Sequence, residues 1–127
     1  MMGHQARAVT AVSLLGPGDK ANTAAATGSW IDVTRYEGDL CFVISVGTVT
    51  AGDIDLDIED ATDISGTGAA SITPDTAFST GVTTATTEKR YIRANSTRGF
   101  IRFVGTITTG PAEVSAVMLA HPGHVGQ

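Results

Sequence analysis

The chain has 127 residues, of which 42% are hydrophobic, 17% charged and 6% aromatic, and its formal net charge is −5. This length predicts one domain whose core is built mainly from Val, Ile, Leu and Ala. The acidic balance argues against nucleic acid as a partner, and no apolar run is long enough to span a bilayer, so we expect no membrane partner.

Residues 1–29 are small, polar and rich in Gly, Ala and Thr, with one apolar patch from Val9 to Leu15. We interpret them as an extended N-terminal arm that includes one edge strand. The Gly16-Pro17-Gly18 break after the patch favours an ordinary arm over a secretory signal. The sandwich domain is expected over residues 30–122, and residues 123–127 are expected to be a loose C-terminal tail.

Three segments that follow the arm are predicted strands of different character. Trp30–Tyr36 alternates and indicates a short strand. Leu40–Val49 is apolar on both faces, which is typical of a central strand. Asp53–Glu59 alternates strictly, with aliphatic side chains facing inward and carboxylates outward. Gly52, in the turn between the last two, is able to take a positive φ.

The second half of the chain contains further predicted strands, and it begins with a weak region between Asp60 and Thr87. Within that region Ala70–Thr73 and Ala77–Val82 are predicted as short edge strands. The remaining predicted strands are Glu88–Asn95, Phe100–Thr108 and Glu113–His121. About seven or eight short strands predict an all-β fold, namely a single-domain, jelly-roll-like antiparallel β-sandwich, with a small barrel as the alternative.

The outward carboxylates of Asp53–Glu59, which we name the acidic strand, are the first candidate site. Alternate residues of a strand lie ~7 Å apart and therefore splay, and the glycine and flanking helices of an EF-hand are missing. We therefore favour a solvated acidic face, or ion pairing across the sheet or a subunit boundary. The basic counterparts are Lys89, Arg90, Arg93, Arg98 and Arg102.

Other reactive groups are sparse. Cys41, the one cysteine, sits in an apolar strand and is interpreted as a small buried hydrophobe of a protein from a reducing cytosol. His121 and His124, with His4, are too few for a convincing metal site. The arginines beside Tyr91 and the phenylalanines at 100 and 103 are interpreted as structural rather than base-stacking. We expect no enzyme activity, no cofactor and no small-molecule substrate.

Four segments form a further pattern: Tyr36-Glu37 before Phe42–Thr50, Ile58–Asp60 with Asp63, Lys89–Arg93, and Val114–Val117 with His121-Pro122. Over residues 30–122 this pattern resembles a family of small virion proteins from tailed bacteriophages and prophages. The resemblance implies a capsid decoration, or cement, protein that is assembled in the host cytoplasm and stabilises the major capsid lattice from outside. The alternatives are a head–tail connector or tail subunit, and a calcium- or carbohydrate-binding adhesion module.

A decoration protein works through its surfaces, and the expected partners are the major capsid protein and copies of the chain itself, with a trimer favoured. We predict that apolar arm residues make contacts between subunits and that charged residues set the polar register. The apolar set is Val9, Val12, Leu14 and Leu15. The charged set is Asp53, Asp55, Asp57, Arg93 and Arg102.

Overall fold

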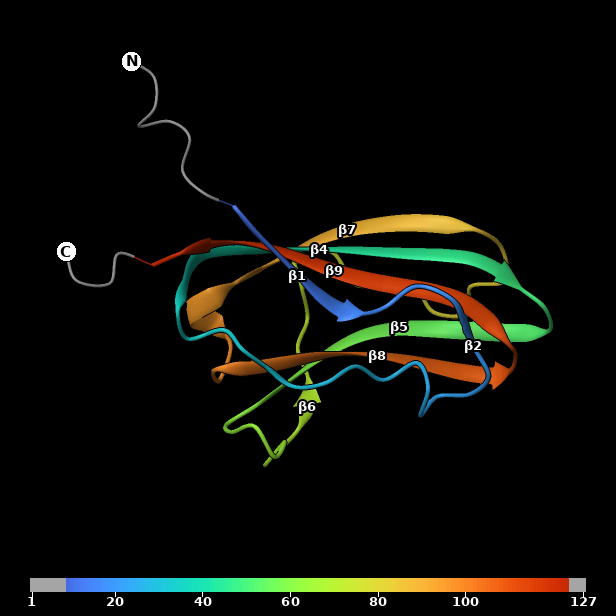
Figure 1. Cartoon of the computed structure of the whole chain (residues 1–127), viewed down its shortest axis with the longest axis horizontal. Coiled ribbons are helices and arrows are strands. Elements are labelled where there is room, and N and C mark those ends of the chain that lie inside the picture. The colour runs from blue at the N-terminus through green and yellow to red at the C-terminus, as the bar shows by residue number, and fades with distance from the viewer. Residues whose placement is uncertain (1–8, 124–127) are drawn as a thin grey trace, which may run out of the picture.

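Two antiparallel sheets pack face to face in the computed structural model, which describes residues 9–123 (Figure 1). Sheet A has the strand order β1 (Thr10–Leu15), β9 (Ala112–Pro122), β4 (Tyr36–Val49) and β7 (Thr86–Arg93), and the short β2 (Asp19–Lys20) also pairs with β9. Sheet B has the order β3 (Ile31–Asp32), β8 (Phe100–Thr109), β5 (Gly52–Ala61) and β6 (Ala70–Ser71). The predicted all-β sandwich is confirmed, with nine strands in the described part of the chain.

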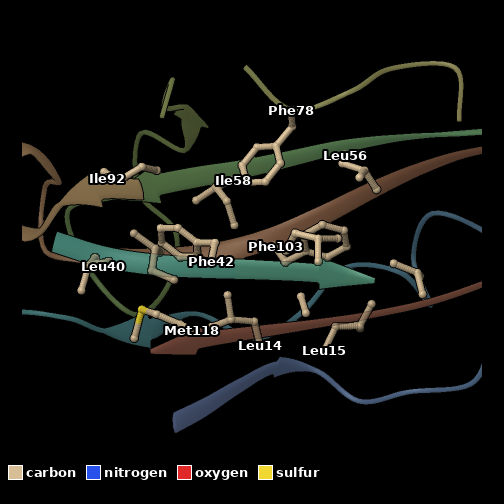
Figure 2. Packing of buried hydrophobic residues seen from close by; sticks show 14 of the residues in the cluster. Leu14, Leu15, Leu40, Phe42, Leu56, Ile58, Phe78, Ile92, Phe103 and Met118 are labelled. Carbon is tan, nitrogen blue, oxygen red and sulfur yellow. The ribbon is translucent and has the colours of Figure 1, made fainter. Parts of the chain in front are cut away.

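The core fills the space between the sheets because the long strands alternate. On β4 every second side chain from Leu40 to Val46 is buried, and on β5 the same holds from Ile54 to Ile58. Phe42 of sheet A and Phe103 of sheet B are 0% exposed, and Figure 2 shows both rings between the layers. Full burial of one such side chain contributes roughly 1.5–3 kcal/mol, so this alternation is the main source of stability.

The chain passes from sheet A to sheet B through the tight turn between β4 and β5. Gly52, the first residue of β5 after this turn, has φ 72°, and a Cβ at this position would collide with the carbonyl oxygen of Thr108 on β8. Both the left-handed backbone and the close approach of β8 require a glycine here. The sequence prediction for this turn is confirmed.

Loops close the two long sides of the sandwich. On one side residues 22–28 run along β8, where Gly105 N donates to Ala26 O and Gly28 N donates to Phe103 O. On the other side residues 72–82 run along β5, and Phe78 inserts into the core (Figure 2). These segments satisfy backbone groups that the sheet edges would otherwise leave open.

The edge strand predicted within the N-terminal arm is present as β1, and the described part of the arm packs on the sandwich. β1 and β2 pair with β9, and a register shift between Ser13 and Leu15 turns both Leu14 and Leu15 toward the core, where they are 4% and 9% exposed. The pair supplies apolar cover that β9 needs on its inner face. Residues 1–8 of the predicted arm and 124–127 of the predicted tail lie outside the described residues.

Two strand predictions are corrected. Within Trp30–Tyr36 the strand ends at Asp32, because the Asp32 carboxylate accepts hydrogen bonds from Thr34 N and Oγ1 and turns the chain. The segment Ala77–Val82 is a loop with one bridge to β5. Its backbone N–H groups at Ser79 and Gly81 donate to the side chains of Glu88 and Asp55 instead of to a strand.

Candidate interaction surfaces

The outer face of sheet A is apolar at its centre. In strand register Cys41 of β4 lies between Leu119 of β9 and Tyr91 of β7, and Val43 lies beside Val117. Most of these side chains are half-buried because neighbours on the sheet shield one another, whereas Tyr91 is 37% exposed. We name this surface the A face. It comprises Val9, Ala11, Cys41, Val43, Tyr91, Val117 and Leu119.

One end of the A face is hollowed into a groove of about 410 Å³. Val9, Cys41, Tyr91 and Leu119 give it apolar walls, and Asp39 and His121 supply its polar groups. His121 Nδ1 is buried and has no hydrogen-bond partner among the described residues. Such a nitrogen is destabilising unless another group reaches it.

The outer face of sheet B is polar, and we name it the B face, comprising Asp53, Asp55, Asp57, Glu59, Arg102, Val104 and Thr106. Asp55 accepts a hydrogen bond of 2.6 Å from Gly81 N, and Asp57 accepts one from Ser71 Oγ. Glu59 forms an ion pair of 2.8 Å with Arg102, whose guanidinium stacks on the Trp30 ring 4.5 Å away. Three carboxylates of the acidic strand therefore have partners within the chain.

The pKa values of three aspartates, of which Asp57 lies on the B face, are shifted by their surroundings. Burial raises the pKa of Asp57, and the hydrogen bond from Ser71 opposes this effect. Hydrogen bonds from Thr34 lower the pKa of Asp32, and those from Thr67 lower the pKa of Asp63. The last two aspartates anchor turns, because each accepts bonds from the loop that follows it.

Two more ion pairs lie at the rims of the core. Asp60, 6% exposed, accepts from the backbone N of Arg98 and from its guanidinium at 2.8 Å, and its hydrogen bond raises the Arg98 pKa. Glu88 accepts from Arg90 at 3.2 Å beside the loop that carries Phe78. Together with Glu59–Arg102, these pairs use three of the five basic residues that the sequence suggested as counterparts of the acidic strand.

No other chemical centre stands out in the part of the chain that the structure describes. No three His, Cys, Asp or Glu side chains of residues 9–123 are grouped so that they would hold a metal ion. Within the same residues no helix has the length and apolar character needed to cross a membrane. A hollow of about 520 Å³ at one end of the sandwich is lined by Tyr36, Arg93 and Arg98, among others.

The structure separates the residues that the sequence grouped as an interface. Val9 is 54% exposed on the A face, whereas Val12 points inward and packs against the core. Leu14 and Leu15 belong to the chain's own core, which leaves little of either side chain accessible for the predicted contact with another subunit. Arg93 is exposed on β7, at the edge of sheet A.

The charged residues of the predicted interface lie mostly on the B face. Asp55 and Asp57 hold a loop and β6, and Arg102 pairs with Glu59 within the chain. Asp53 is half-buried on the same face. The acidic side chains and Val9 are therefore on opposite sides of the molecule, and they do not form one site.

Sequence reasoning missed the A face as a candidate site. The signal was present in Leu40–Val49, because Cys41 and Val43 are apolar at outward positions of a strand. That pattern was interpreted as a central strand covered on both faces. In the structure β4 is central in its sheet, but no other element of the described residues packs on its outer side.

Comparison with known proteins identifies the fold. No family model matches the chain, and no curated protein matches it by sequence. Among solved structures, the chain is similar to one titled crystal structure of SPBc2 prophage-derived protein YomS, with a TM-score of 0.56 and 12% sequence identity. The match covers 88% of this chain and 93% of that one, so the two share their fold along almost their whole length.

Proposed function

We propose that this chain is a structural protein of a tailed-phage virion and that it decorates the outside of the capsid. The observation that carries the proposal is the fold shared with a prophage-derived protein over nearly the full length of both chains. The sequence pattern of residues 30–122, which resembles small virion proteins, supports it independently. The partners in this proposal are the major capsid protein and further copies of the chain.

The physical properties of the sandwich suit this role. A shell-bracing protein requires a rigid body and surfaces that match a lattice, and many weak contacts then add up through symmetry. Here the loops over both long sides are tied to the sheets by backbone and carboxylate bonds, which makes the module rigid. We propose that the chain acts through its surfaces, without a catalytic group or cofactor.

The direct test is binding of the purified chain to expanded capsids of the phage that encodes it, measured by co-sedimentation. Deleting the N-terminal region would remove β1 from sheet A, so point variants are preferable. We expect Asp53→Lys, on the B face, to lower capsid occupancy several-fold. The matched control is Asp19→Lys, which makes the same charge change on exposed β2.

Two results of this experiment would contradict the proposal. The first is no binding of the wild-type chain to the shell at any concentration. The second is incorporation as a single ring at one vertex, which would assign the chain to the head–tail connector or the tail instead. Equal loss of binding for Asp19→Lys and Asp53→Lys would remove the B face as the contact with the shell.

A further inference from the structure

We propose that two copies of this chain pair through their A faces, related by a two-fold axis that runs along the strands between β4 and β9. The contact is isologous, so each copy presents the same surface to the other. The inference rests on the A face alone and does not require the virion role.

The first argument is the placement of the exposed apolar side chains. Among residues 9–123 the exposed large hydrophobic residues are Val9 at 54%, Ile64 at 64% and Tyr91 at 37%. Val9 and Tyr91 lie on opposite edges of the A face, beside β1 and on β7. The proposed axis places Tyr91 of each copy over the β1 edge of the other, where the small Ala11 leaves room for the ring. The single two-fold rotation thus covers both Val9 and Tyr91.

The second argument is the centre of the face, where the strand register is self-complementary. Cys41 pairs with Leu119 and Val43 pairs with Val117 across β4 and β9. An axis between these two strands lays each residue over its cross-strand neighbour in the second copy. All four central positions then meet apolar side chains, and Lys89, which lies beside Val43 on β7, faces Ser13 of the second copy.

The third argument is the polar end of the groove. His121 Nδ1 is buried without a hydrogen-bond partner, and Asp39 lines the same groove from β4. Because the axis exchanges β4 and β9, it brings Asp39 of the second copy toward His121. A carboxylate and an imidazole therefore oppose each other across the axis, so the polar end of each groove does not meet apolar side chains.

The area of the outer face of sheet A is also close to the area that a stable interface requires. The strands β1, β9, β4 and β7 have 6, 11, 14 and 8 residues. With a rise of about 3.3 Å per residue and a spacing of about 4.8 Å, the whole outer face of sheet A covers a footprint of roughly 600 Å². A standard stable interface buries roughly 800 Å² on each partner, which includes the relief of the side chains. Sheets that stack face to face lie roughly 10 Å apart and about 30° off parallel, so a pair of A faces is ordinary sheet packing.

Cys41 provides a probe for this contact because it is the one cysteine and lies at the centre of the A face. We expect sedimentation equilibrium to give twice the monomer mass. We also expect labelling of Cys41 by a thiol reagent to slow at least tenfold as the protein concentration rises through the dimerisation range. A mass that stays monomeric with concentration-independent labelling would overturn the proposal, and so would a trimer.

Two single variants test the surface. Tyr91→Lys should give a monomer whose Cys41 reacts rapidly at every concentration. Ile64→Lys, the same kind of change on an exposed side chain away from the A face, should keep the dimer and the protection. Circular dichroism establishes that both variants retain their strands. A dimer that survives Tyr91→Lys would contradict the pairing.

A charge-swap variant tests the axis itself. Ala11→Glu alone should dissociate the dimer as Tyr91→Lys does, because each places one charge in an apolar contact. The double variant Ala11→Glu/Tyr91→Lys should associate more tightly than either single variant, since the carboxylate and the ammonium face each other across the two-fold axis. Double-variant chains that remain as monomeric as the single variants would refute this arrangement.

Discussion

The outer faces of the two sheets differ although the strands beneath them obey the same alternation. On β5 three of the four outward carboxylates, Asp55, Asp57 and Glu59, have a partner within the chain. On β4 the outward positions include Cys41 and Val43, and the described part of the chain places no element over them. A sandwich requires apolar side chains only on its inner faces, so outward apolar residues indicate a second contact.

The contrast also changes the meaning of the acidic strand. A row of outward carboxylates suggests a cation site or a charged docking surface when only the sequence is considered. In the structure Asp55 holds the loop of residues 72–82 through Gly81 N, Asp57 fixes the short β6 through Ser71, and Glu59 pairs with Arg102. Three carboxylates of the B face therefore hold parts of the fold in place, and Asp53 is the one that we propose for contact with the shell. The apolar A face is left uncovered by the described residues.

The largest expected effect tests whether the stability of both sheets depends on one shared core. Phe42→Ala on sheet A and Phe103→Ala on sheet B each remove a fully buried ring. Each should lower the free energy of unfolding by roughly 3–5 kcal/mol, because the cavity left behind does not collapse fully. Urea denaturation at low protein concentration measures both. A loss under about 1 kcal/mol for either variant would show that its sheet does not depend on this core.

An intermediate effect separates inward from outward carboxylates on the same strand. Asp60→Ala removes the buried acceptor of the Arg98 backbone N–H and should cost roughly 1–3 kcal/mol of stability. Glu59→Ala removes a half-exposed ion pair and should cost roughly 0.2–1 kcal/mol. Urea denaturation of both variants gives the difference. Equal losses would contradict the distinction between the core rim and the B face.

The smallest effect is the pH dependence contributed by Asp57. Its pKa is raised in the folded protein, so the native state binds more protons than the unfolded chain between the ordinary and the raised value. The ionised carboxylate of Asp57 is therefore less favourable to the fold than its protonated form, and this penalty is lost as the pH falls from the raised pKa to the ordinary one. Asp57→Asn should increase stability at pH 7 and leave it unchanged in acid.

Asp63 serves as the control with the opposite sign. Its folded pKa is lowered, so its contribution to stability is present above the ordinary pKa of an aspartate and is lost as the pH falls through the lowered value. Asp63→Asn should therefore reduce stability at pH 7. Urea midpoints measured from pH 3 to pH 7 test both variants. Stability changes of the same sign at pH 7 for the two substitutions would show that burial does not govern the pKa of Asp57.

The long strands were predictable because their periodicity is a local property of the sequence. β4, β5, β8 and β9 agree with the segments predicted from alternation, and Gly52 marks the turn between the first two. The β1 segment was predictable only as an edge strand within an arm, because an apolar patch next to Gly and Pro does not reveal which strand it will pair with. Its burial depends on β9, which is about a hundred residues away in the sequence.

The candidate surface was harder to predict than the fold. The pairing of Glu59 with Arg102 was among the predicted alternatives, since opposite charges on neighbouring strands are visible in the sequence. Outward apolar residues on β4 look the same whether another layer of the same chain or a second molecule covers them. Only the three-dimensional arrangement shows that the described chain leaves this side of sheet A uncovered.

An electron-microscopy map of the phage particle that contains this chain is the most direct test of the account. We predict many copies on the outer surface of the capsid, joined in pairs through their A faces. A map that places the chain in a single ring at the neck, or that finds no copy in the particle, would contradict the proposed function. Copies on the shell with solvent-exposed A faces would contradict the pairing alone.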